Sequence, residues 1–303
     1  FFILFLLPVL RKQKNFPAVL AVLLLVDLYG YGGTSIRPNE ERFDTIDVPA
    51  KSMIVQKIQK TPGLFRVMEI YKEGRENRVF PVFPCFNMLD HIQDLGAYSP
   101  LVMREYQNFL KGWGYINNSL AVQWVDPEEV LKKIPMLELM NVRYILSTVP
   151  LQHPSLHEAA REGEVYLYEN QQAIPRAFFL ASRRSLAKLE DIQFSELTPI
   201  SEIKHLQQSL DLDFPAPVSG LIVVTDIYYK NWRVWVDGKE ARLEKAGGIF
   251  RSVHVEAGIH HVRMEYDPAL YRNLAYASGL VFLLGFAVIL RSGLRTAQKK
   301  VTK

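Results

Sequence analysis

Few residues in this chain have the types and spacing that chemistry at a site requires. Asp90, His91 and Asp94 could carry out acid–base chemistry, but no nucleophile stands near them, so solvated or capping positions are the simpler interpretation. Asn87 and Tyr98 stand near a predicted loop-to-helix junction and could line a binding groove, although a turn-forming Asn and a packed Tyr would look the same. We therefore predict no catalytic residue in this chain, and a weak binding site at Asn87 and Tyr98.

Histidines and an arginine give the next candidates. His260 and His261 are neighbours on a predicted strand, so their side chains point to opposite faces, and His254 lies on another strand. No acid or cysteine completes a ligand set with them, so we predict neither a metal nor a cofactor. Arg176 follows Pro175 and is expected to pair with an internal acid, with a bound phosphate as the alternative.

Two tryptophans alternate with aliphatic residues near the C-terminal end and could stack on sugars. We predict that Trp232 fills a β core, because large aromatic side chains do so more often than they bind ligands. Trp235 lies on the opposite face of the same strand, where it is a candidate contact for a bound acceptor. Packing of Trp235 against the preceding region or against a membrane is the other interpretation.

The elements that would position these residues change along the chain. Helix and strand patterns alternate from a helix at 52–60 and a strand at 64–70 up to a polar connector at 185–215, which indicates an α+β region. From residue 219 the pattern is cleanly β. Trp232–Val236 reads as a strand, and Asp237-Gly238 supplies the positive φ angles of a two-residue hairpin turn. Short strands with regular turns predict a small antiparallel sandwich.

Charge and hydropathy point to a membrane. The run 274–290 has no charged residue, and 16–32 is a second, shorter apolar run that contains Asp27. The chain has a formal net charge of +4, but its two acid-free basic patches, 11–14 and 291–303, carry more than this, so the rest is net negative. Basic flanks of apolar runs indicate cytoplasmic segments and argue against nucleic acid as a partner. A signal peptide over 11–26 is the alternative to the first span.

Together these patterns predict a membrane protein, in which transmembrane helices flank an extracytoplasmic α+β region that ends in a small antiparallel β-sandwich. The chain begins inside an apolar run, so we expect it to be the C-terminal part of a longer, multi-pass protein of the cell membrane, with residues 33–270 outside and both basic flanks cytoplasmic. The predicted segments are the tail of a preceding transmembrane helix at 1–10, a cytoplasmic loop at 11–15, a transmembrane helix at 16–32, the α+β region at 33–215, the sandwich at 216–268, a transmembrane helix at 271–291 and a cytoplasmic tail at 292–303.

An ordered set of short motifs resembles the YfhO family of large bacterial multi-pass membrane proteins. The pattern is a tyrosine pair, a Trp, "VDG", a "G-x-F-R" turn and an "AG-x-H" turn, followed by a span and a basic tail. The matching residues are Tyr228, Tyr229, Trp232, Val236, Asp237, Gly238, Gly248, Phe250, Arg251, Ala257, Gly258 and His260. The sequence departs from the pattern at Lys230-Asn231, where Pro-Gly is usual. Earlier stretches such as "GAYSPL", "LMNVRYILS" and "YENQQAIPRA" are also similar.

The resemblance implies a glycosyltransferase of the GT-C architecture. Such an enzyme would move a sugar from a polyprenyl-phosphate donor to an envelope polymer on the outer side of the membrane, and its catalytic carboxylate would precede this sequence. The lipid bilayer, the lipid-linked sugar and the polymer acceptor would be the partners. This part would cap the site or bind the acceptor through Asn87, Tyr98 and Trp235. The alternative is a non-catalytic, membrane-anchored envelope protein that binds or scaffolds.

Overall fold

The computed structural model divides the chain into two compact units. One is globular and covers residues 50–267, and the other consists of residues 1–49 together with 268–303. The structure describes residues 52–70, 90–96, 103–111, 116–118, 122–124, 126–181, 192, 194–206 and 208–301.

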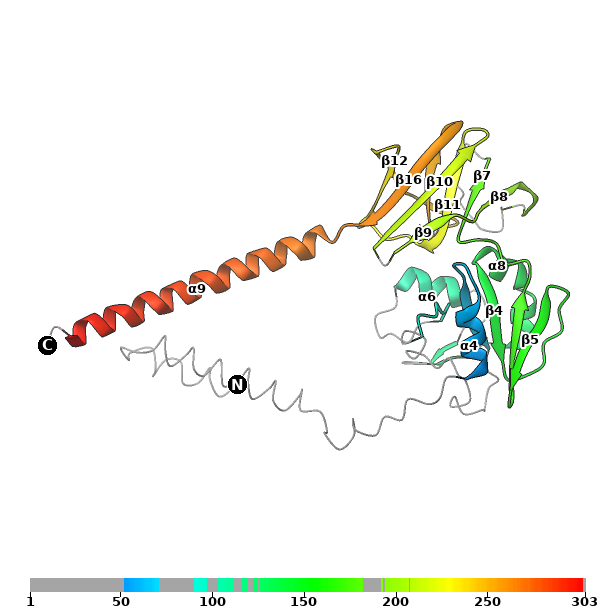
Figure 1. Cartoon of the computed structure of the whole chain (residues 1–303), viewed down its shortest axis with the longest axis horizontal. Helices are drawn as coiled ribbons and strands as arrows, with labels where there is room; N and C mark the ends of the chain where they lie inside the picture. Colours follow the sequence, from blue (N-terminus) through cyan, green and yellow to red (C-terminus); the bar gives the residue numbers. More distant parts are fainter. Residues whose placement is uncertain are drawn as a thin grey trace. The chain divides into compact units, whose positions relative to one another are not determined.

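A four-stranded sheet with one helix on its outer face forms the first part of the globular unit (Figure 1). Ser52 begins the helix α4 (Met53–Lys60) by accepting a hydrogen bond from the backbone N–H of Val55 at 3.1 Å. The apolar side of α4 packs on the sheet through Ile54 and Ile58. The strand order is β1 (Arg66–Ile70), β4 (Val142–Ser147), β6 (Val165–Asn170) and β5 (Leu156–Glu162).

Two five-stranded sheets form the second part, a β-sandwich. Their inner faces meet in one core, in which Phe179 and Val253 of one sheet pack with Leu212 and Met264 of the other. Gly220 fits here because a Cβ atom would lie 2.5 Å from the carbonyl oxygen of Leu180. One sheet has the order β14 (Glu244–Ala246), β15 (Phe250–Val255), β11 (Gly220–Ile227), β7 (Ala177–Leu180), β8 (Leu197–Ile200), and the other has the order β13 (Lys239–Ala241), β12 (Trp232–Val236), β16 (Gly258–Tyr266), β10 (Ser209–Ala216), β9 (Ile203–His205).

Short helices fill the space between the sandwich and the four-stranded sheet, as Figure 1 shows for α6 and α8. A second core runs through this layer, from Met68 and Ile145 on the four-stranded sheet to Phe178 and Phe250 on the sandwich. Phe109 and Phe250 pack edge to face, with their ring centroids 6.1 Å apart. The connecting elements are α6 (Arg104–Lys111), α7 (Pro127–Leu131), α8 (Ile134–Leu139), the hairpin of β2 (Ile116–Asn118) with β3 (Val122–Trp124), and the 3₁₀ turn Phe194–Glu196.

The predicted fold class is wrong. The described residues are mostly β, in three main sheets, and they contain one long apolar helix rather than transmembrane helices on both sides of an α+β region. The sandwich is also larger than predicted, because β7, β8, β9 and β10 all begin before residue 216. Most of β10 falls within the predicted connector 185–215, but its residues Leu210, Leu212 and Phe214 are buried and alternate with Asp211 and Asp213. The predicted transmembrane helix at 16–32 lies outside the described residues.

Several local predictions are confirmed. The helix predicted at 52–60 is α4, and the strand predicted at 64–70 contains β1. The hairpin forms between β12 and β13, with φ angles of 52° at Asp237 and 76° at Gly238. Trp232 is half-buried and packs against the sandwich core.

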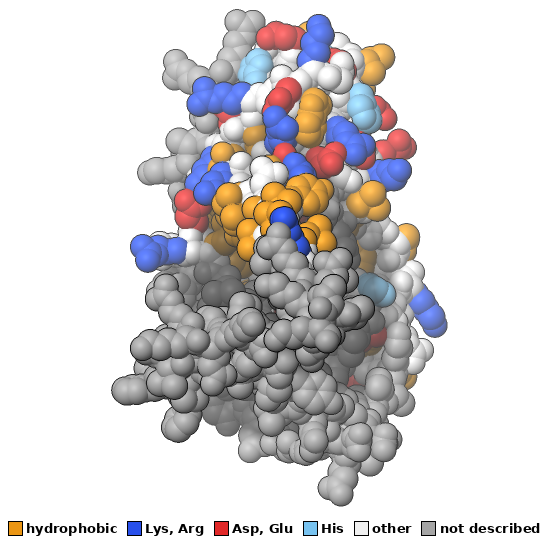
Figure 2. Space-filling model, turned by 90° about the vertical axis from the view of Figure 1, so that its left-hand side faces the viewer, with side chains coloured by type: hydrophobic (Ala, Val, Ile, Leu, Met, Phe, Trp, Pro, Cys, Tyr) orange, Lys and Arg blue, Asp and Glu red, His pale blue; other side chains and the backbone are white. Residues whose placement is uncertain are grey.

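The helix α9 (Ala269–Val301) belongs to the other unit. Within the described part of the chain, Ala269–Ala287 is the one helical segment long and apolar enough to cross a membrane. Its mean hydropathy is 1.2, and none of it is buried. Leu280, Val281 and Phe282 are among its exposed apolar side chains. Figure 2 shows hydrophobic side chains gathered in the middle of the view.

Candidate functional site

Four charged side chains from four places in the fold meet between the sandwich and the four-stranded sheet. Arg66 begins β1, Arg176 precedes β7, Asp226 lies near the end of β11 and Arg251 lies in β15. The register of β11 against β15 shifts between Val224 and Ile227, and Asp226 stands in this irregularity. Such bulges re-aim side chains out of the regular alternation. The irregularity thus places a carboxylate where the alternation of β11 would not.

Asp226 is the centre of this arginine cluster. Its Oδ1 accepts hydrogen bonds from Arg66 Nη2 and Arg176 Nη1, both at 2.8 Å. Its Oδ2 accepts one from Arg251 Nη2 at 2.6 Å and lies 3.4 Å from His205 Nε2. Three guanidinium groups therefore share one carboxylate, and these four side chains have a formal net charge of +2.

Two of the three arginines are held by further hydrogen bonds. Arg66 donates to the carbonyl oxygens of Met140 at 2.8 Å and of Thr225 at 2.7 Å. Arg176 donates from Nε to Asn141 Oδ1 at 3.0 Å and from Nη2 to Gln93 Oε1 at 2.5 Å. These neutral acceptors fix both guanidinium planes but do not cancel their charge.

Arg251 is held differently. Its guanidinium carbon lies 3.7 Å from the centroid of the Trp232 ring, a close cation–π contact. Its side chain is 4% exposed, yet Nε and Nη1 have no hydrogen-bond partner in the part of the chain that the structure describes. A buried donor without a partner carries the full cost of its desolvation. Of the three arginines, Arg251 is therefore the one whose burial is least compensated by hydrogen bonds.

The pKa values of the cluster reflect its surplus of positive charge. Burial, with repulsion from Arg176, lowers the pKa of Arg66 to about 10. Burial also lowers the pKa of Arg251. Burial alone would raise the pKa of Asp226, but the hydrogen bond with His205 and the three arginines hold that pKa well below its usual range. The carboxylate therefore stays ionised, and the surplus positive charge remains.

A pocket of about 470 Å³ adjoins the cluster. Segment 93–95 forms one wall, held beside β1 by the hydrogen bond from Val67 N–H to Gln93 O at 2.8 Å. Tyr106, His205 and Trp232 also line the pocket. Asp94 lines it too, and burial raises the pKa of this half-buried carboxyl to about 7. Near neutral pH the pocket therefore keeps an excess of positive charge.

The predicted binding site at Asn87, Tyr98 and Trp235 stays a prediction. Asn87 and Tyr98 lie outside the described residues, and Trp235 is half-buried on the sandwich sheet, 5.9 Å from the guanidinium of Arg233. Asp90 and His91 line another pocket, of about 350 Å³, whereas Asp94 lines the arginine pocket.

Arg176 does pair with an internal acid, as predicted. Sequence reasoning did not identify Asp226 as this acid, nor Arg66 and Arg251 as the other arginines that share it. A sequence signal was present for Arg251, which follows Phe250 in a predicted strand, and for Asp226, which comes two residues after the apolar run 221–224.

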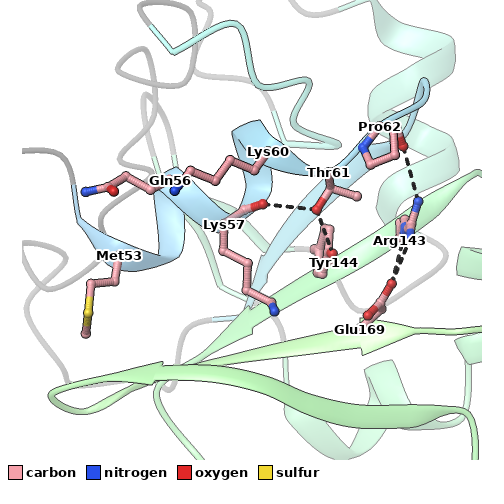
Figure 3. Close-up of a pocket in the computed structure, with 9 residues that line it drawn as sticks. All are labelled: Met53, Gln56, Lys57, Lys60, Thr61, Pro62, Arg143, Tyr144 and Glu169. Carbon is pink, nitrogen blue, oxygen red and sulfur yellow. Dashed lines mark hydrogen bonds and ion pairs between the residues drawn. The ribbon is translucent and has the colours of Figure 1, made fainter.

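A second groove, of about 530 Å³, lies between α4 and the four-stranded sheet (Figure 3). Lys57 and Lys60 approach it from α4, but its other polar groups satisfy one another. Arg143 pairs with Glu169 at 3.0 Å, and Thr61 Oγ1 donates to the carbonyl oxygen of Lys57 at 3.0 Å. The groove lacks a buried donor or acceptor in need of a ligand, so the arginine pocket is the better candidate.

No family model, no curated protein and no solved structure matches this chain. Its function therefore has to be argued from its own residues.

Proposed function

We propose that the globular unit is a binding module attached to a membrane by α9, and that it serves an envelope glycosyltransferase by holding the polymer that accepts the sugar. Membrane attachment rests on the way that α9 directly follows β16, and the transferase role rests on the resemblance to the YfhO family. Two residues, Asp267 and Pro268, separate the last strand from a helix with an exposed apolar surface. Two residues span at most about 7 Å, so a membrane around α9 would lie close to the last strand.

Binding fits the described residues better than catalysis. Removal of the proton from the acceptor hydroxyl needs a carboxylate or imidazole that is not already held by other partners. Asp226 is committed to three arginines, and Asp237 accepts from His260 at 2.8 Å. Asp94 is the carboxyl in the described pocket whose pKa lies near neutrality, so it is the residue on which any transfer by this chain would depend.

Membrane attachment is tested with Leu280→Arg. An arginine near the centre of a membrane helix costs about 2.5–3.5 kcal/mol on insertion scales. The variant should therefore lose much of its recovery with liposomes in a flotation assay. Ile259→Arg is the matched control, because Ile259 is 83% exposed on the sandwich and lies outside α9. Equal flotation of Leu280→Arg and the wild type would contradict attachment through α9.

The acceptor-binding role is tested with the full chain in liposomes. The chain should pull down purified anionic envelope polymer but should transfer no sugar from a polyprenyl-phosphate donor. Failure to retain polymer would favour the scaffold alternative. Transfer that Asp94→Asn abolishes would place the chemistry in this chain and overturn the binding-module proposal.

A further inference from the structure

We propose that the arginine pocket binds a phosphate group that carries two negative charges. The proposal concerns the ligand of a site built from Arg66, Arg176, Arg251 and Asp226, and it holds or fails whether or not the chain serves a glycosyltransferase. It rests on two independent observations, the surplus charge of the cluster and the missing hydrogen-bond partners of Arg251.

The surplus charge selects for a dianion. Burying one cation without its counter-ion is costly, and here three arginines share one aspartate. A phosphate monoester near neutral pH carries close to two negative charges and would balance the formal +2 of the cluster. A carboxylate or a phosphodiester has a single charge and would leave half of the surplus in place.

The free donors select for an oxyanion with several oxygens. Arg251 Nε and Nη1 are two separate donors on one planar group, and neither has a hydrogen-bond partner among the described residues, so an oxyanion with several oxygens supplies acceptors for them. Trp232 covers one face of that plane and so holds the guanidinium in its orientation. His205 lines the same pocket, and its Nε2 lies 3.4 Å from Asp226 Oδ2.

The pocket has room for more than the phosphate itself. Its volume is about 470 Å³, and its lining includes apolar residues such as Ile227 and Phe250. A phosphate with a small organic group would therefore fit. Because Nε and Nη1 are buried, the ligand would reach them after a small rotation of Arg251 or of the side chains around it.

Isothermal titration calorimetry of the full chain in detergent tests the proposal directly. Glycerol 3-phosphate, a monoester, should bind about tenfold more tightly than dimethyl phosphate, a diester, because it carries about one more negative charge. Acetate at the same ionic strength should bind no better than the diester. No detectable heat with glycerol 3-phosphate or inorganic phosphate would overturn the proposal, and so would equal affinities for monoester and diester.

Nanodiscs of two lipid compositions identify the source of the phosphate. Phosphatidic acid presents a monoester on a lipid, and phosphatidylglycerol presents a diester on the same lipid scaffold. If the pocket takes a lipid headgroup, chain in nanodiscs of phosphatidic acid should no longer bind added glycerol 3-phosphate, whereas chain in phosphatidylglycerol should. Undiminished binding in both would assign the site to a free phosphate compound.

Arg251→Met and Arg242→Met separate the pocket from general surface charge. Both remove one guanidinium, but Arg242 is 88% exposed and outside the cluster. Arg251→Met should weaken binding of glycerol 3-phosphate about tenfold or more, and Arg242→Met by less than about twofold. Equal losses in the two variants would place phosphate elsewhere.

The wild-type protein gives a measurement that does not depend on a variant folding. Phosphate should shift the ¹H–¹⁵N resonance of Arg251 Nε, which lacks a hydrogen-bond partner in the unliganded protein. The resonance of Arg176 Nε should move less, because that group already donates to Asn141. A spectrum in which neither resonance moves on saturation would contradict the proposed ligand.

Discussion

Two regions of the β-sandwich carry many charges, and they use them in opposite ways. The cluster around Asp226 is buried, and its cations outnumber its anions. The outer face of the other sheet pairs its charges at the surface, where Arg233 contacts Glu240 and Asp267, and Arg263 contacts Glu265 and Asp211. Exposed pairs are screened by water and contribute little, whereas a buried charge is costly unless it is fully compensated. Burial, rather than the number of ion pairs, decides which region matters for stability and binding.

The largest expected effect comes from removing the centre of the buried cluster. Asp226→Ala leaves three arginines facing one another and should lower the free energy of unfolding by about 3–5 kcal/mol. Chemical denaturation followed by tryptophan fluorescence measures this. Glu240→Ala removes a carboxylate from the exposed face and serves as the control. A loss for Glu240→Ala as large as that for Asp226→Ala would remove the distinction between the two regions.

Asp94 makes the buried pocket sensitive to pH. Its pKa is about 7 in the folded chain against an ordinary value of 3.8, so the folded state holds this proton more tightly than the unfolded state. Stability from this group is therefore full below about pH 4 and is lost as the pH rises to 7. Asp94→Asn should remove this slope and stabilise the protein by roughly 1–2 kcal/mol at pH 8. An unchanged slope in urea denaturation across pH 4–8 would contradict the assignment to Asp94.

A smaller effect is expected on the exposed face. A double-mutant cycle with Arg233→Met and Glu240→Gln should give a coupling energy of about 0.2–1 kcal/mol. The coupling should shrink further in 1 M salt, because solvent-exposed charges are screened. A coupling that exceeds 2 kcal/mol, or one that salt leaves unchanged, would mean that this pair is not the simple surface contact described.

The smallest effect belongs to His260 and Asp237. The hydrogen bond with Asp237 raises the pKa of His260, and the hydrogen bond with His260 lowers the pKa of Asp237. The contribution of the pair is present between about pH 4 and 6.5, falls as the pH drops through the lowered pKa of Asp237, and falls as it rises through the raised pKa of His260. His260→Gln should remove the extra stability in that pH range, measured as the melting temperature in thermal melts. His254→Gln, at an exposed histidine 4.0 Å from Glu256, is the control.

Local elements could be predicted because their causes are local. Ser52 begins α4 through its own side chain, and Asp237-Gly238 makes the turn through its own φ angles. The extent of the sandwich could not be predicted in the same way. Whether 209–216 is a connector or a strand depends on its pairing with β16, which starts more than 40 residues later.

The candidate site depends even more on distant pairing. Arg66 and Asp226 are separated by 160 positions and meet because β1 and β11 belong to neighbouring layers. The sequence predicted an acid opposite Arg176 without indicating which one. The charged residues inside apolar strands, Arg251 above all, were the signal that could have led to the cluster.

Asp226 also joins the two cores of the globular unit. Arg66 comes from the four-stranded sheet, whereas Arg176 and Arg251 come from the sandwich side, so one carboxylate binds both halves. Separation of the two halves would break the Arg66–Asp226 ion pair and expose the second core, which packs against both halves. The two cores should therefore unfold as one cooperative transition, with no stable intermediate in which the sandwich persists alone.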